Sequence, residues 1–333
     1  MPEFLTIGEA ADLLRIGRRA LYEGLRRGEI AGAEKIGNQW CLRRDKLLRW
    51  VYESSGKVGQ ASGRINGHRL LRSSEIAAQP RLRPFFGYYG GKWRDTVKFY
   101  PRPVHGRIVE PFAGSAGYSL RFPSMEVVLC ERDPIVAAVW HYLIKVKPSE
   151  IRAIPDVPVD GSVDDLRAPQ EARWLVGFWV NRGTARPRKR PSKWMRDGIR
   201  PGSFWGERVR ETIATQVESI RHWQVFECSY EECPVVREST WFVDPPYQYA
   251  GRHYKFGSGN IDYEALSRWC RSRKGQVIVC ENEGADWLPF QNLAHVKTTR
   301  RGRHSSEVIW SNRPLLPDQL DLLRTADAGS ETR

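Results

Sequence analysis

Short apolar runs, separated by longer polar and amphipathic segments, dominate the chain from Leu82 onward. One run opens RIVEPFAGSAGYSLRF at 107–122, a second is EVVLCERDP from residue 126, and five more lie at 224–228, 240–244, 276–281, 293–297 and 307–311. Such runs, rich in Val, Ile, Phe and Trp, are typical of buried strands, and helical segments between the earlier ones indicate βαβ units. The pattern predicts an α/β domain around seven strands, with the last two forming a hairpin at the sheet edge.

Residues 141–223 interrupt this alternation. The segment is helical in pattern, dotted with prolines and basic, and its length of about 80 residues exceeds that of an ordinary connection. We therefore expect an inserted subdomain between two strands of the sheet.

The first fifty residues have a different, mostly helical period. TIGEAADLLR at 6–15 begins with a capping box of Thr6 and Glu9, and a second, arginine-rich helix is expected over 18–27. Alternating runs around Gly37-Asn38 then predict a hairpin, and a helix is expected over 44–51. Helix, turn, basic helix and hairpin is the order of a winged helix-turn-helix. Residues 54–79, rich in Gly and Ser, indicate a linker.

The charge of the chain is concentrated in two blocks. The net charge is +14; residues 1–84 hold 16 Lys and Arg against 9 Asp and Glu, and residues 181–210 hold 10 against 2. A charge block is often only a solvated face, but two blocks, one of them interleaved with Trp194, Phe204 and Trp205, favour a nucleic-acid partner.

Targeting and metal signals are weak. The chain lacks a run of 18 apolar residues, and its N-terminus carries acids where a signal peptide has bases. We therefore expect that the protein has no membrane span and is cytoplasmic. The six cysteines form no C-x-x-C pair, which favours reduced thiols and no metal.

A glycine-rich turn between two predicted strands indicates a nucleoside site. The turn A-G-S-A-G follows the strand that ends at Glu110, and the next strand ends in the acids Glu131 and Asp133. Glycines let the backbone approach a ligand, and a terminal acid can accept both ribose hydroxyls. The turn lacks the G-x-G-x-x-G spacing of a dinucleotide site, so a cofactor with a ribose but no phosphates fits better, and S-adenosylmethionine is the common one.

The stretch WFVDPPYQYAGRHYKF at 241–256 ends a strand with an acid and two prolines. Pro245 and Pro246 forbid a helix or a continued central strand, so Asp244 and Tyr247 project from a rigid turn. Taken alone, this is as consistent with a stiff surface turn as with a site.

Three motifs together resemble those of the Dam-type (D12 class, α-group) N6-adenine DNA methyltransferases. They are Tyr88-Tyr89-Gly90-Gly91-Lys92, Glu110-Pro111-Phe112-Ala113-Gly114-Ser115 and Asp244-Pro245-Pro246-Tyr247, in that group's order, with residues 141–223 where it has its target-recognition insertion. The resemblance implies a seven-stranded, Rossmann-like methyltransferase sheet, S-adenosylmethionine as cofactor and duplex DNA as substrate.

The same resemblance implies a role for each matching residue. The implied catalytic residues are Asp244, Pro245, Pro246 and Tyr247, with Asp244 and the Pro245 carbonyl accepting the N6 hydrogens and Tyr247 stacking on the flipped base. The implied cofactor-binding residues are Tyr88, Gly91, Lys92, Glu110, Pro111, Phe112, Ala113, Gly114, Ser115, Gly117, Glu131, Tyr230 and Asp244. Ser229 stands where the group usually has an acid, which leaves the adenine contact open.

Residues 1–52 resemble the excisionase-type branch of the MerR-like DNA-binding domains. The matches are Leu5-Thr6, Glu9-Ala10-Ala11, Leu13-Leu14, Arg19, Tyr22, Gly28, Ile30, Ile36-Gly37 and Trp40. A helical adaptor that binds protein is the alternative for this module. The residues expected to contact DNA are Arg18, Arg19, Arg26, Arg186, Arg188, Lys189, Arg190, Lys193, Arg300 and Arg301.

The expected organisation is a winged helix-turn-helix at 1–52, a linker at 53–81, a methyltransferase domain at 82–314 and a tail at 315–333. Methylation of cytosine N4 or of an RNA amine, and a DNA-binding regulator with an inactive methyltransferase domain, remain alternatives. The recognised site and a partner restriction endonuclease stay open.

Overall fold

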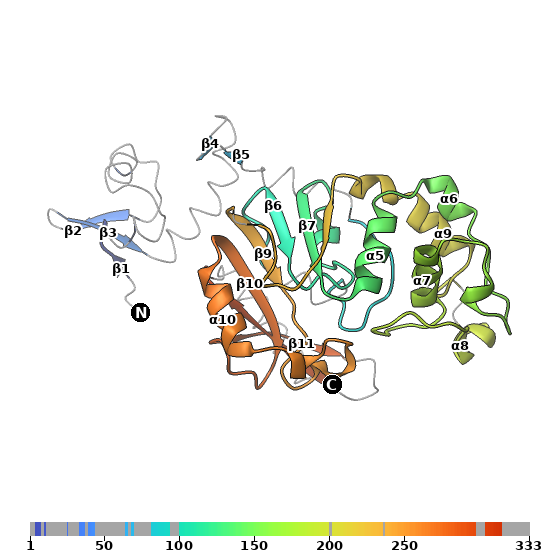
Figure 1. The fold of residues 1–333 in the computed structure, drawn as a ribbon. Helices are drawn as coiled ribbons and strands as arrows, with labels where there is room; N and C mark the ends of the chain where they lie inside the picture. Colours follow the sequence, from blue (N-terminus) through green and yellow to red (C-terminus); the bar gives the residue numbers. More distant parts are fainter. Residues whose placement is uncertain are drawn as a thin grey trace, which may run out of the picture. The chain divides into compact units, whose positions relative to one another are not determined.

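The computed structural model describes residues 81–93, 100–199, 202–235, 237–297 and 304–314, and, before these, residues 4–7, 10, 25, 33–36, 39–43, 64–65 and 68–69. The chain divides into two compact units, the first made of Met1–Ala78 with Leu315–Leu322 and the second of Gln79–Pro314 with Leu323–Arg333 (Figure 1).

The first unit contains a small antiparallel sheet. Its strands β1 (Phe4–Leu5), β2 (Ala33–Ile36) and β3 (Gln39–Arg43) lie in the order β1-β3-β2. In the β2–β3 pair Ile36 lies opposite Gln39, which leaves two residues between the strands and confirms the predicted hairpin. Ala10 and Leu25, which lie in the ranges of the first two predicted helices, are buried.

A minimal ladder, β4 (Arg64–Ile65) with β5 (His68–Arg69), lies in the segment predicted to be a linker. Several other sequence predictions lie outside the described residues. They are most of the three helices over 6–15, 18–27 and 44–51, the arginines Arg18, Arg19, Arg26, Arg300 and Arg301, and the tail from residue 315.

The second unit is built on a seven-stranded sheet in the order β11-β12-β10-β9-β6-β7-β8. The strands are β6 (Arg107–Glu110), β7 (Glu126–Glu131), β8 (Gln224–Glu227), β9 (Ser239–Val243), β10 (Gly275–Asn282), β11 (Gln291–Lys297) and β12 (His304–Ser311). Strands β8, β7, β6, β9 and β10 are parallel, and β12 is antiparallel to both of its neighbours. The expected fold class, an α/β domain around a seven-stranded, mostly parallel sheet, is confirmed, including the β11–β12 hairpin at the edge.

The burial of the strands explains why their sequences are apolar runs. Every residue of β9 is buried, as expected for a central parallel strand that is covered on both faces, whereas the edge strand β8 buries only Val225. The chain therefore has few polar positions in the middle of the sheet, and polar groups collect at the strand ends.

The helices cover the sheet unequally. They are α5 (Pro134–Leu143), α6 (Pro148–Arg152), α7 (Gln170–Trp179), α8 (Lys193–Arg196), α9 (Glu207–Ala214) and α10 (Tyr263–Ser272), with short 3-10 turns η3 (Ser119–Arg121), η4 (Val163–Asp165), η5 (Val217–Ile220), η6 (Gly251–His253) and η7 (Ser258–Asn260). Helices α6 to α9 all come from the segment between α5 and β8 and gather beside α5, while α10 lies at the other end of the sheet (Figure 1).

The connection from β6 to β7 differs from expectation. The helical segments expected between the early strands include one between β6 and β7, but the structure has only the 3-10 turn η3 there. Pro123 comes two residues after the end of this turn and β7 begins at Glu126, so the chain has no room for a longer helix. Among the described residues, none of the helices combines the length and apolarity that a membrane span requires.

Candidate functional site

A cavity lies at the carboxyl ends of the parallel strands, where the strand order reverses between β6 and β9. Ligands of open α/β sheets bind at such a switch point. The three sequence motifs converge here: the 88–92 loop, the turn after β6 and the turn after β9 all line the same cavity. All of the residues predicted to bind a cofactor are among its lining residues, whereas Pro245 and Tyr247 are not.

The 88–92 loop is held in place by aromatic packing. The rings of Phe86 and Phe178, on α7, are stacked with centroids 5.0 Å apart, and Phe85 meets Trp140 of α5 edge to face at 5.8 Å. The Trp179 indole N–H also donates to the Phe85 carbonyl at 2.8 Å. Helices α5 and α7 therefore fix the loop on which Tyr88 and Lys92 lie.

The glycine turn after β6 depends on the absence of side chains. Gly114 has φ of 45°, in the left-handed region that favours glycine, and its carbonyl accepts the Trp140 indole N–H at 2.8 Å. A Cβ on Gly117 would lie 2.6 Å from the carbonyl carbon of Lys92. The turn and the 88–92 loop can approach this closely only because glycine occupies that position.

Two acids at the end of β7 take different positions: Glu131 is its last residue and Asp133 follows it. Glu131 accepts the backbone N–H of Gly114 with one carboxylate oxygen and that of Asp133 with the other, both at 2.9 Å. Burial raises the pKa of Glu131 to about 7, although these two N–H donors oppose the shift. Asp133 caps α5 by accepting the Ile135 N–H at 3.0 Å, with Pro134 in the first turn. Glu131 thus faces the glycine turn, and Asp133 has a structural task.

The turn after β9 is rigid for reasons beyond its prolines. The Pro246 carbonyl accepts the Tyr263 hydroxyl from α10 at 2.6 Å, and the Gly251 N–H donates to the Tyr247 carbonyl at 2.7 Å. Among the described residues, none donates a hydrogen bond to the Pro245 carbonyl. The Pro245 carbonyl therefore has no described donor, and Pro245 itself does not line the cavity.

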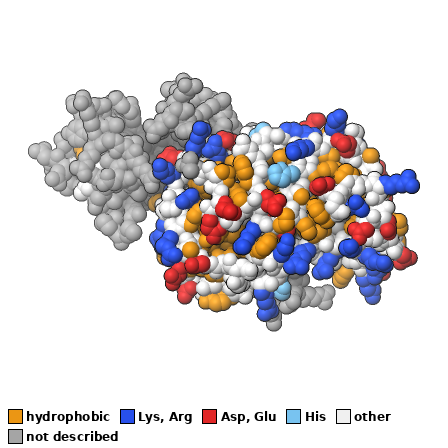
Figure 2. All heavy atoms as spheres, in the orientation of Figure 1, with side chains coloured by type: hydrophobic (Ala, Val, Ile, Leu, Met, Phe, Trp, Pro, Cys, Tyr) orange, Lys and Arg blue, Asp and Glu red, His pale blue; other side chains and the backbone are white. Residues whose placement is uncertain are grey.

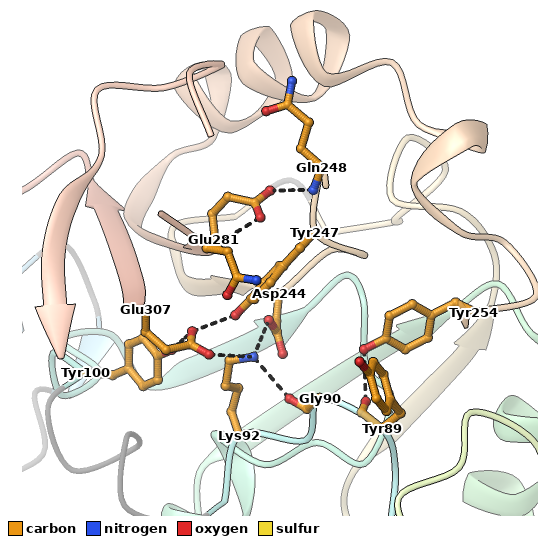
Figure 3. Close-up of polar contacts among 11 residues, drawn as sticks. Tyr89, Gly90, Lys92, Tyr100, Asp244, Tyr247, Gln248, Tyr254, Glu281 and Glu307 are labelled. Atoms are coloured by element: carbon orange, nitrogen blue, oxygen red, sulfur yellow. Dashed lines mark hydrogen bonds and ion pairs between the residues drawn. The ribbon is translucent and has the colours of Figure 1, made fainter. Parts of the chain in front are cut away.

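Lys92 and Asp244 form an ion pair in the site (Figure 3). The Lys92 ammonium lies 3.0 Å from Asp244 Oδ1 and donates to the Gly90 carbonyl at 3.0 Å, with the lysine 7% and the aspartate 19% exposed. Burial raises the pKa of Asp244 to about 6; Lys92 opposes this shift and Glu307 adds to it. Burial lowers the pKa of Lys92, but the carboxylates of Asp244 and Glu307 outweigh it and raise that pKa above its usual range.

Sequence reasoning missed Glu307, on β12. Its Oε2 accepts the Tyr247 hydroxyl at 2.7 Å and the Tyr100 hydroxyl at 3.3 Å, and its Oε1 lies 4.0 Å from the Lys92 ammonium. Because β12 is antiparallel to β10, its early residues reach the edge where the parallel strands end, and Glu307 lies opposite Asn282. A lone acid before the buried run Val308–Trp310 was the available signal, but its meaning depends on the strand order.

Tyr247 is not among the residues that line the cavity. Its hydroxyl is held by Glu307, and the Lys92 ammonium lies 4.6 Å from its ring centroid. The predicted stacking of a base on this ring would have to use the ring face away from Lys92.

Glu110, at the end of β6, is a second buried carboxyl of the cavity. It is 2% exposed and accepts the Ser119 N–H at 2.7 Å. Burial raises its pKa to about 8, with the Ser119 hydrogen bond opposing the shift. The side chain is therefore tied to the connection that carries the glycine turn.

Aromatic side chains line the end of the cavity near β8. Phe112 and Tyr230 are stacked, with centroids 5.4 Å apart and planes at 28°, and both line the cavity. Ser229, the departure from the family pattern, accompanies them, but its N–H and hydroxyl both donate to Glu232 at 3.0 Å. The ring pair offers an apolar surface for a flat group, and the neighbouring Ser229 adds no charge to it.

The basic segment of the insertion starts at the rim of the cavity. The Tyr89 N–H donates to the Thr184 carbonyl at 3.2 Å, and the predicted DNA-binding residues Arg186, Arg188, Lys189, Arg190 and Lys193, which follow directly, are exposed. Trp194 of α8 is 62% exposed among them. In the space-filling view, several Lys and Arg side chains are exposed at the end of the unit where α8 lies, with acids between them (Figure 2). Lys189 is itself paired with Asp164 at 2.8 Å.

Metal and thiol chemistry have no visible centre in the described part of the chain. No group of three or more His, Cys, Asp or Glu side chains there is arranged to hold a metal. The cysteines with described side chains, Cys130, Cys228, Cys233, Cys270 and Cys280, are free thiols.

Comparison with known proteins identifies the first module. Residues 4–55 match the helix-turn-helix domain family, so the chain carries such a domain at its N-terminus. No curated protein matches the sequence.

Two solved structures show distant similarity. A conserved hypothetical protein from Streptococcus pyogenes is 11% identical, with 62% of this chain and 86% of that chain covered and a TM-score of 0.30. The rRNA methyltransferase aviRa from Streptomyces viridochromogenes is 13% identical, with 81% and 95% covered and a TM-score of 0.28. At such TM-scores neither similarity specifies a function.

Proposed function

We propose that the protein is a DNA methyltransferase that transfers a methyl group from S-adenosylmethionine to N6 of adenine. The observation that carries the proposal is the convergence of three motifs, far apart in the sequence, on one cavity at the switch point of the sheet. These motifs are the ones by which the chain resembles the Dam-type adenine methyltransferases.

The cavity fits a nucleoside cofactor without phosphates. Its lining contains four acids, Glu110, Glu131, Asp133 and Asp244, which disfavour a phosphate-bearing ligand. We propose that Glu131 accepts the ribose hydroxyls and that the glycine turn, which packs closely against the 88–92 loop at Gly117, lies along the methionine part. The stacked rings of Phe112 and Tyr230 suit the adenine. When bound, S-adenosylmethionine supplies the electrophilic methyl group.

The turn after β9 suits the activation of an exocyclic amine. The lone pair of adenine N6 is delocalised into the ring, so the amine has to be held in a pyramidal arrangement. Asp244, which lines the cavity, accepts one N6 hydrogen. The Pro245 carbonyl, to which no described residue donates, accepts the other. The fixed prolines hold both acceptors in place, and such positioning supplies much of the rate of a direct transfer.

Duplex DNA is the proposed substrate because two regions of the chain suit it. The helix-turn-helix domain at 4–55 belongs to a class of modules that bind DNA, and the exposed basic segment after Thr184 begins at the cavity rim. A base has to leave the duplex to reach Asp244, so a phosphate-gripping surface beside the cavity is what base flipping requires. The excisionase-like character of the module and its contribution to DNA affinity belong to the same proposal.

A transfer assay with labelled S-adenosylmethionine tests this function. Purified protein is incubated with unmethylated plasmid DNA or with ribosomal RNA, the polymer is digested, and the nucleosides are separated by mass spectrometry. We expect label in N6-methyldeoxyadenosine alone. Label in N4-methyldeoxycytidine or in a ribonucleoside would replace adenine or DNA as the target, and no label with intact cofactor binding would favour a DNA-binding regulator.

A further inference from the structure

Glu307 is a buried acid that belongs to none of the three motifs but contacts two of them. It is 12% exposed, accepts the hydroxyl of Tyr247 at 2.7 Å, and lies 4.0 Å from the ammonium of Lys92 (Figure 3). Lys92 is in turn 3.0 Å from Asp244. Figure 3 shows the ammonium between the two carboxylates, one from β12 and one from the turn after β9.

The charges in this group do not cancel. One ammonium faces two carboxylates, and each of the three side chains is less than one fifth exposed. A buried carboxylate is costly unless it is paired and hydrogen-bonded, and Glu307 meets this condition with two phenol hydroxyls, from Tyr100 and Tyr247, and one cation. Its polar contacts therefore go to residues that surround Asp244.

A neighbouring acid shows what a merely structural carboxylate does at the same edge. Glu281, at the end of β10, is fully buried and accepts the N–H groups of Gln248, Asn282 and the Trp287 indole. Those contacts secure the backbone and a loop. The contacts of Glu307 instead go to the ammonium and to the tyrosine of the turn.

We propose, on the basis of the proposed methyltransferase function, that Glu307 is a positioning residue that holds Tyr247 and, through Lys92, directs the Asp244 carboxylate toward the target amine. The Tyr247 hydroxyl donates to Glu307, which fixes the ring beside Asp244. The shared ammonium is drawn toward both acids, so the lysine holds Asp244 less tightly than it would in a simple pair. An Asp244 carboxylate that is only partly neutralised remains a good acceptor for an amine hydrogen.

The charge of Glu307 should affect how the rate of methylation depends on pH. The titratable groups that face Asp244 are Lys92 and Tyr100 from the segment before β6, Glu110 of β6, Tyr247 and Tyr254 after β9, Cys280 and Glu281 of β10, and Glu307 of β12. Asp244 accepts the amine hydrogen as a carboxylate, so activity falls as the pH drops through its pKa. Burial raises that pKa to about 6, Lys92 lowers it and Glu307 raises it.

Opposite substitutions should therefore move the acid limb of the pH–rate profile in opposite directions. Glu307→Gln keeps an oxygen acceptor for Tyr247 but removes a negative charge, which lowers the pKa of Asp244 and shifts the limb to lower pH. Lys92→Met removes the cation and shifts the limb to higher pH. Glu307→Asp keeps the charge with a shorter side chain, so the rate falls while the limb stays near its wild-type position.

The experiment measures single-turnover methylation of unmethylated plasmid DNA from about pH 5 to about pH 9. For Glu307→Gln we expect a rate about tenfold lower, an unchanged KM for S-adenosylmethionine and the shift to lower pH. The matched control is Glu283→Gln, which removes an equal charge from the exposed stretch after β10 and should match the wild type. Acid limbs that stay in place in both Glu307→Gln and Lys92→Met would overturn the proposal.

A second readout separates this proposal from the proposed function. The pKa of Asp244 is followed by NMR of the full chain labelled with ¹³C at the aspartate carboxyl carbons, with Asp244→Asn assigning the signal. We expect a lower pKa in Glu307→Gln and a higher one in Lys92→Met. If the wild-type protein transfers no methyl group, the proposed function fails, while an Asp244 titration that is the same in all variants refutes the coupling itself.

Discussion

The cavity and the basic segment of the insertion lie next to each other but differ in the sign of most of their charged groups and in how far water reaches those groups. The cavity is lined by buried or half-buried carboxyls beside the buried ammonium of Lys92, and burial raises the pKa values of Glu110, Glu131 and Asp244. The segment that follows Thr184 exposes arginines and lysines to water. Water screens the exposed cations of the basic segment and is largely excluded from the carboxyls of the cavity.

This difference sets the size of the effects that substitutions should have. A buried charge acts on its neighbours over short distances with little screening, so one substitution can remove a catalytic step or move a pKa. Exposed cations contribute individually small and salt-dependent terms that become large only in sum. The predictions below use this contrast.

The largest effect is expected for Asp244→Ala. The substitution removes the acceptor that orients the amine, so the methylation rate should fall on the order of a hundredfold or more. S-adenosylmethionine binding, measured by calorimetry, should weaken only moderately because Asp244 contributes one of many contacts of the cavity. Methylation near the wild-type rate would contradict the assigned chemistry.

A strong but salt-dependent effect is expected when several exposed cations are removed together. The triple variant Arg188→Ala, Arg190→Ala, Lys193→Ala should bind DNA on the order of tenfold more weakly and lower the slope of log affinity against log salt by about 2 to 3. The measurement is fluorescence anisotropy across a salt series.

The control for that series is Arg268→Ala. Arg268 is an exposed cation on α10, at the other end of the sheet, and is paired with Glu264 (Figure 1). Its removal should leave the salt slope unchanged. A triple variant that behaves like this control would show that the basic segment does not contact phosphates.

Removal of the first unit should affect affinity but not target choice. A chain that begins at Gln79 keeps the whole second unit, including the insertion. We expect it to methylate the same sequence motif while binding DNA several-fold more weakly, because a linked DNA-binding module raises the local DNA concentration. Sequencing of modified bases reads the motif, and a changed motif would assign recognition to the helix-turn-helix.

Glu131→Ala should act mainly on the cofactor. A charged acceptor for ribose hydroxyls contributes in the ground state and transition state alike, so KM for S-adenosylmethionine should rise by about tenfold with kcat little changed. Unchanged cofactor affinity in calorimetry would shift the ribose role to Asp133, although Asp133 already caps α5.

The smallest effect is expected for Glu110→Gln and concerns stability. Because burial raises the folded-state pKa of Glu110 to about 8, the folded state holds a proton that the unfolded state has lost, and stability falls as pH rises from about 4.5 to about 8. The amide carries no such charge. We expect a melting temperature about 2 to 4 °C higher than wild type above pH 8 and a smaller difference at pH 5. A gap that is the same at both pH values would place the effect elsewhere.

Much of the second unit could be predicted because its signals are local. The buried strands have apolar runs, so all seven were found, and the motif residues at their carboxyl ends meet because parallel strands share an edge. The β2–β3 hairpin was found from its turn residues in the same way.

What escaped prediction depends on tertiary context. Glu307 reaches Lys92 only because β12 runs antiparallel to β10, and no local pattern specifies that pairing. The hydrogen bond from the Tyr247 hydroxyl to Glu307 was missed for the same reason. The helix expected after Gly114 failed because Pro123 and the early start of β7 limit its length.

The most direct test of the central claim is single-molecule sequencing of DNA from cells that express the protein in a host without DNA methylation of its own. The account predicts N6-methyladenine at one sequence motif with the wild-type chain and none with Asp244→Ala. N4-methylcytosine in place of N6-methyladenine, or the same adenine signal in both samples, would contradict it.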